Sequence, residues 1–131
     1  MALERYGRLL RRETLLIDRL VAACYATRQC FPAFVAATML YFTAVTSCER
    51  RLLAGESPGF LAADDVELSG RLSGLAQQLI NARPGVCQWD DSSAQRELIA
   101  RIREGIRPWN HIGLLDPCTR NMYHRTALPV G

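Results

Sequence analysis

The sequence predicts an all-α protein in which four principal helices pack around an apolar central helix, followed by an irregular C-terminal tail. Two observations indicate this fold class. Apolar residues recur at spacings of three and four along most of the chain, and no stretch alternates apolar and polar residues as a strand would. Clusters of glycine and proline divide the chain into four segments of helical length. Because 131 residues are enough for one domain, we expect a single helical domain over residues 1–131.

The first expected helix covers residues 3–26. Arginines fall mostly between its apolar positions, as in an amphipathic helix with one buried face. The apolar positions are Leu3, Tyr6, Leu10, Ile17, Leu20, Val21 and Cys24.

The arginines of this segment, with Arg50 and Arg51, could in principle form a phosphate-binding face. Acidic residues are interspersed among them, several at helical pairing distance. We therefore expect a solvated, salt-bridged surface and no nucleic-acid partner. The acids are Glu4, Glu13, Asp18 and Glu49.

The second expected helix covers residues 32–53 and is the central one. No charged residue occurs between Cys30 and Cys48, so this helix requires cover on every side. Its length would allow a membrane span. Four hydroxyl side chains make it only weakly hydrophobic, however, and no second span accompanies it, so we favour a buried helix over lipid. These are Thr38, Thr43, Thr46 and Ser47.

The third and fourth helices are expected over residues 64–82 and 92–106, with a tail over 107–131. Asp64, Asp65 and Glu67 favour a helix start through the helix dipole. Ser92 and Gln95 have the spacing of a capping box. In the tail, Asp116 followed by Pro117 predicts a capped turn. The apolar faces are Leu68, Leu72, Leu75 and Leu79, then Leu98, Ile99, Ile102 and Ile106.

Composition excludes several kinds of chemistry. All sixteen basic residues are arginine, which rules out a lysine Schiff base or a P-loop lysine in this chain. The five cysteines form no CxxC pair, so we interpret them as small core residues of a reducing compartment. The first residues carry charge and lack the apolar core of a signal peptide, which predicts a cytoplasmic location.

The tail crowds His111, Asp116, Cys118 and His124 into fourteen residues. Their spacing matches no metal-ligand set and no pairing of nucleophile with base. We therefore predict no catalytic, cofactor-binding or metal-binding residue in this chain.

Seven segments, in order along nearly the whole chain, resemble the C-terminal helical region of flavin-dependent halogenases and related FAD-dependent oxidoreductases. They are LLRRE at 9–13, LIDRLV at 16–21, MLYFTA at 39–44, ERR at 49–51, GFLAADD at 59–65, PWNHIGLLDP at 108–117 and RNMY at 120–123.

The resemblance implies a helical domain that packs over a larger N-terminal flavin domain and helps to wall its substrate pocket. In that family the FAD fingerprint GxGxxG and the catalytic lysine belong to the flavin domain, and neither motif occurs here. We therefore expect this chain to bind no cofactor alone, with FAD held by the parent enzyme, and to perform no chemistry by itself. The partner would be a flavin domain in cis or in trans.

Two other interpretations stay open at this point. One is a free-standing helical module for protein interaction or self-association, and the other is a small membrane-associated protein. For the partner surface or pocket wall we predict four aromatic residues and one amide, namely Phe34, Tyr41, Phe42, Trp109 and Asn110.

Overall fold

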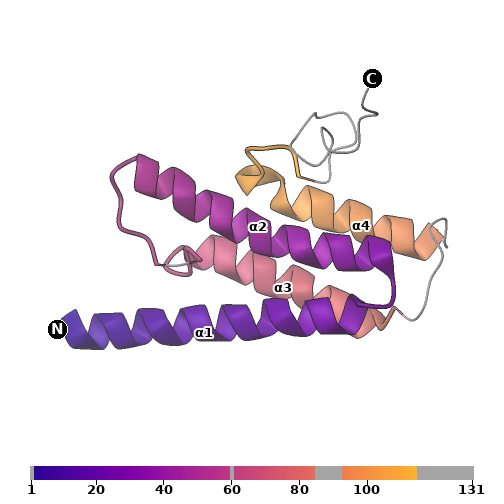
Figure 1. Cartoon of the computed structure of the whole chain (residues 1–131), viewed down its shortest axis with the longest axis horizontal. Coiled ribbons are helices and arrows are strands. Elements are labelled where there is room, and N and C mark those ends of the chain that lie inside the picture. The colour runs from indigo at the N-terminus through magenta and orange to yellow at the C-terminus, as the bar shows by residue number, and fades with distance from the viewer. Residues whose placement is uncertain (1, 60, 85–92, 115–131) are drawn as a thin grey trace, which may run out of the picture.

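The chain folds into four α-helices and one short 3-10 turn in a computed structural model that describes residues 2–59, 61–84 and 93–114 (Figure 1). The fold class is all-α, as the sequence predicts, and the described residues contain no strand. The elements are α1 (Ala2–Thr27), α2 (Phe31–Leu53), α3 (Val66–Ala82), α4 (Ser93–Ile106) and η1 (Arg107–Trp109).

Helix α3 begins two residues later than expected because the two aspartates before it have separate roles. Asp65 has an extended backbone and is the N-cap, with its carboxylate accepting a hydrogen bond from the Leu68 amide at 3.1 Å. Asp64 instead pairs with Arg51. At the other end Arg83 ends the helix in the left-handed conformation, at φ 44°.

Some expected features lie outside the described residues. They are the capping box of Ser92 with Gln95, the turn at Asp116 and Pro117, and the positions of Cys87, Cys118 and His124.

Helix α2 packs against α1, α3 and α4, and α3 likewise packs against all three of the other helices. The buried side of α2 is built mainly from small residues, which let the neighbouring helices approach closely. Leucines and isoleucines from the other three helices complete the core. The fully covered residues of α2 include Ala33, Ala36, Ala37, Leu40 and Ala44, and those around them include Leu20, Leu72, Leu79 and Ile102.

The other three helices cover α2 only in part. Phe34, Tyr41 and Phe42 are each 37–41% exposed, on the side of the helix away from the alanines. Three neighbouring helices enclose only part of a helix's circumference, so the remaining side of α2 faces outward although it carries no charge.

Helix α1 is also less buried than its apolar pattern predicts. Its first buried residue is Leu16, and Leu3, Tyr6 and Leu10 are all exposed. The cause is length, because 26 residues span about 39 Å whereas the 17 residues of α3 span about 26 Å. The N-terminal end of α1 therefore extends past α3 (Figure 1).

The cysteines differ from one another. Cys24 and Cys48 are free thiols, as expected, but Cys30 is disulfide-bonded. The prediction of a plain reduced thiol is therefore wrong for Cys30.

Candidate functional site

The outward side of α2 carries a row of large apolar side chains, which we call the aromatic face. Its main members are Phe31, Phe34, Tyr41 and Phe42, with exposed fractions of 51, 37, 38 and 41%. Phe34 follows Phe31 by three residues, Tyr41 follows Phe34 by seven, and Phe42 is next in the chain. In a helix with 3.6 residues per turn, these spacings place all four on one side. The rings of Tyr41 and Phe42 meet edge to face, with centroids 5.8 Å apart.

Helix α1 adjoins the aromatic face at Cys24. This residue lies beside Thr38, which is on α2 between Phe34 and Tyr41. The Thr38 hydroxyl itself donates to the Phe34 carbonyl at 2.9 Å. On α1, Val21 and Tyr25 are close to Cys24 along the helix and are exposed. Burial at this seam raises the pKa of the Cys24 thiol, so it stays protonated at neutral pH.

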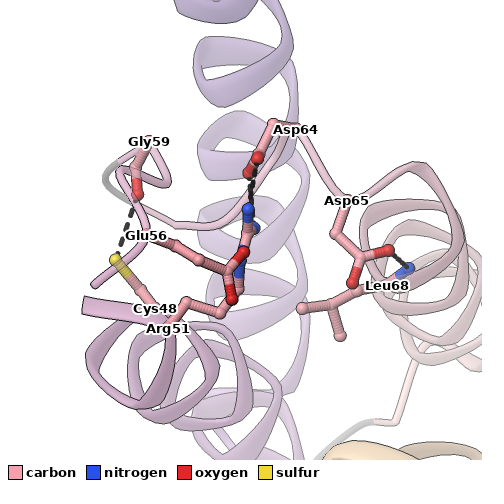
Figure 2. A network of polar contacts seen from close by, with 7 residues as sticks. All are labelled: Cys48, Arg51, Glu56, Gly59, Asp64, Asp65 and Leu68. Carbon is pink, nitrogen blue, oxygen red and sulfur yellow. Dashed lines mark hydrogen bonds and ion pairs between the residues drawn. The ribbon is translucent and has the colours of Figure 1, made fainter. Parts of the chain in front are cut away.

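The C-terminal end of α2 carries a polar network instead (Figure 2). Arg51 donates two hydrogen bonds to the Asp64 carboxylate, at 2.8 and 2.6 Å, and one to Glu56 at 3.0 Å. The Cys48 thiol donates to the Gly59 carbonyl at 3.0 Å. The network thus fastens the loop between α2 and α3 to the end of α2. The Arg51 guanidinium lowers the pKa of Asp64.

A pocket of about 220 Å³ lies beside this network, between the end of α2 and the segment after α4. The hydroxyl of Ser47 is buried there and has no hydrogen-bond partner within the described part of the chain. Burial, and then the charge of Arg50, lower the pKa of His111. The lining residues are Ser47, Arg50, Arg51, Ala54, Glu56, Asp65, Trp109 and His111.

The pocket does not assemble a catalytic pair. Ser47 lines it together with His111, but the serine hydroxyl donates no hydrogen bond to the imidazole or to any other described group. Nucleophilic catalysis requires a base within hydrogen-bonding reach of the nucleophile. The carboxylates of Glu56 and Asp65 are already engaged with Arg51 and with the Leu68 amide.

The described residues offer no place for a metal ion, because no group of three or more histidine, cysteine or acidic side chains converges among them. Flavin pyrophosphates are commonly bound by free amides at a helix N-terminus after a glycine-rich turn, and α3 does not begin in this way. The N-terminus of α3 is occupied by the Asp65 carboxylate, and Gly70 and Gly74 lie inside the helix.

The five residues predicted for the partner surface fall into two groups. Phe34, Tyr41 and Phe42 lie together on the aromatic face. Trp109 lines the pocket at the far end of α2, where its ring lies 5.7 Å from the Arg71 guanidinium. Sixteen residues, or about 24 Å of helix, separate Phe34 from the pocket residue Arg50.

Asn110 has a local structural role. Its side-chain amide donates to the Leu114 carbonyl and its oxygen accepts from the Leu114 amide, both at 2.7 Å. It therefore closes the turn after η1, and its polar atoms face its own chain.

Sequence reasoning missed other members of the surface. Phe31 extends the aromatic face by one turn, and its position three residues before Phe34 was the available signal. The apolar pattern predicted for the first helix includes Val21 on the buried side and leaves Tyr25 out. The sequence did not place Ser47 and Arg50 at a pocket, because the segment that faces them is distant in sequence.

Comparisons with known proteins found no matching family model, no matching curated protein and no matching solved structure. One described helix, α2, is long and apolar enough to cross a membrane. This is weak evidence for a span, since core helices of soluble proteins often have the same length and composition.

Proposed function

We propose that this chain is a helical partner-binding domain that packs its aromatic face against a flavin domain, as the C-terminal region of a FAD-dependent halogenase or related monooxygenase. It contributes a pocket wall and stability, and FAD and the chemistry belong to the partner. The observation that carries the proposal is the exposure of Phe31, Phe34, Tyr41 and Phe42 on a helix without charges from 31 to 48.

Physical reasoning favours a protein partner for this face. Aromatic residues are enriched and charged residues depleted in the centre of protein interfaces. Half-covered aromatic rings on one side of a helix, two of which already pack against each other, can be desolvated together by one flat partner surface. Seven segments resemble the halogenase C-terminal region in the same order, and this resemblance supports a flavin domain as the partner.

The test uses the gene neighbourhood and then the purified proteins. The reading frame directly upstream should encode a strand followed by GxGxxG, and that flavin protein should be coexpressed with this chain. A yellow complex that survives gel filtration is the expected result. Phe34→Ser and Tyr41→Ser should weaken the complex at least ten-fold, because hot-spot aromatics typically contribute more than about 1.4 kcal/mol each.

A matched control is Val66→Ser, since Val66 is 66% exposed and lies on α3, outside the aromatic face. It should leave the complex intact. If no flavin protein is encoded nearby and the chain alone is a dimer that becomes monomeric in Phe34→Ser, the free-standing self-association module is the correct function. If the chain alone is monomeric and Phe34→Ser lowers its stability by about 2 kcal/mol or more, the face belongs to the core and the proposal is wrong.

A further inference from the structure

The N-terminal half of α1 has two unlike faces, both exposed. Leu3, Tyr6 and Leu10 are 85, 64 and 48% exposed and follow one another at steps of three and four residues. The arginines Arg5, Arg8 and Arg12 follow the same steps, displaced by two residues. Two residues correspond to about 200° around a helix, so the two rows lie on opposite sides.

The arginine side of this segment of α1 carries a net positive charge. Residues 2–12 contain four arginines and one glutamate. Arg5, Arg8, Arg11 and Arg12 form no ion pair with any other described residue, although the sequence predicted a salt-bridged surface. Glu13 points away from these arginines, because its carboxylate lies against Gly59 of the loop after α2.

This end of α1 packs only loosely against the rest of the chain. None of residues 2–15 is buried, Leu9 and Glu13 lie against Gly59 of the loop after α2, and the helix extends past α3 (Figure 1). Tertiary packing therefore leaves both rows available along the first turns.

We propose that residues 2–12 form an amphipathic anchor that binds an anionic membrane surface. A helix with arginine on one side, leucine and tyrosine on the other and low overall hydrophobicity lies in the plane of the lipid headgroups. The apolar row enters the boundary between headgroups and acyl chains, while the long arginine side chains extend to the lipid phosphates. This mode needs no membrane span, and it uses a different surface from the aromatic face of α2.

The occupant follows from the combination of the two rows. A nucleic acid would use the arginines but not Leu3 and Tyr6. A protein partner of the apolar row would not need arginines on the opposite side of the helix. A helix that lies in the plane of the headgroups sinks its apolar row into the lipid, while the long arginine side chains of the other side extend back toward the phosphates, so a lipid surface engages both rows at the same time.

The experiment is flotation of the full chain with phosphatidylcholine vesicles, with and without phosphatidylglycerol, at low and high salt. Binding should require phosphatidylglycerol and weaken at high salt. Arg5→Gln with Arg8→Gln should weaken it roughly thirty-fold, since each surface arginine contributes about a five-fold factor. Leu3→Ser with Tyr6→Ser should weaken it roughly ten-fold or more.

Matched controls lie on other helices. Arg96→Gln with Arg101→Gln removes the same charge from exposed positions of α4, and Val66→Ser removes an apolar side chain that is 66% exposed. Both should retain binding within about three-fold, and circular dichroism should show all variants helical. Absence of binding to anionic vesicles, equal binding to neutral vesicles, or equal loss in the α4 control would each overturn the proposal.

Capture by a protein or RNA without vesicle binding would overturn it as well. These results are independent of the function proposed above, because that proposal depends on the α2 variants Phe34→Ser and Tyr41→Ser.

Discussion

At the scale of single residues, Arg51 is the residue with the most polar partners at the end of α2. Its guanidinium holds Asp64 through two hydrogen bonds and Glu56 through one, and so ties the loop before α3 to the helix. Partial exposure, 25% for the Arg51 side chain and 35% for that of Asp64, moderates the energy of this contact.

Asp64→Asn should therefore lower the free energy of unfolding by about 0.5 to 1 kcal/mol at neutral pH. The pKa of Asp64 is lower in the folded protein than its ordinary value of 3.8, so its contribution is present above that value and is lost as the pH falls below it. Urea unfolding at neutral and acidic pH checks this, with Glu104→Gln, at an exposed ion pair on α4, as control. A difference that persists at low pH would contradict it.

A second prediction at this scale concerns the alkylation of the cysteine thiols. Burial raises the pKa of both Cys24 and Cys48, so neither should react with iodoacetamide at neutral pH in the folded protein. In urea without reductant both should be alkylated, whereas Cys30 should require reductant first. Peptide mass spectrometry distinguishes the three. Alkylation of Cys30 in unreduced protein would contradict its assignment to a disulfide.

At the scale of the elements, α3 and α4 approach closely at Gly105. A methyl group at this position would lie 2.7 Å from a methyl carbon of Leu75, which is itself buried. The Gly105 carbonyl also accepts a hydrogen bond from Arg71, at 3.1 Å. Close packing thus explains why a residue that disfavours helices lies near the end of α4.

Gly105→Ala should leave stability unchanged or lower it by up to about 2 kcal/mol, because the gain in helix propensity is offset by the displacement of Leu75. Gly74→Ala is the matched control. A methyl group there meets nothing within 4 Å, so this change should stabilise the protein by about 0.5 to 1 kcal/mol. Thermal melts of the two variants test the prediction, and equal stabilisation would show that α3 and α4 are further apart.

The elements themselves were predictable from periodicity. Leu68, Leu72, Leu75 and Leu79 mark the buried side of α3 in the sequence and are buried in the structure. The start of α3 was less predictable, because Asp64 and Asp65 are equally good helix-start residues. Only the position of Arg51, thirteen residues earlier in the chain, makes Asp64 an ion-pair partner and leaves Asp65 as the cap.

At the scale of the whole molecule, Phe34, Tyr41 and Phe42 were predicted for a partner surface because they are aromatic, and periodicity alone would not have selected them. Phe34, Leu40 and Tyr41 all lie in one uncharged stretch, and periodicity cannot choose between sides that are both apolar. The three neighbouring helices decide it, leaving Leu40 fully covered and the aromatic residues exposed. The sequence also could not predict that Trp109 lies apart from the aromatic face. The position of Trp109 depends on how the segment after α4 returns to the end of α2.

The extension of α1 beyond α3 also has a consequence for how the amide hydrogens of this helix exchange with solvent. Amides before Leu16 are held by intrahelical bonds alone, and isolated helical turns fray easily. Amides after it open only when the helix leaves the core. Protection should therefore rise along one continuous helix, from nearly free exchange at its start to the slowest exchange around Leu20 and Ala23, so that α1 behaves as two units of different stability.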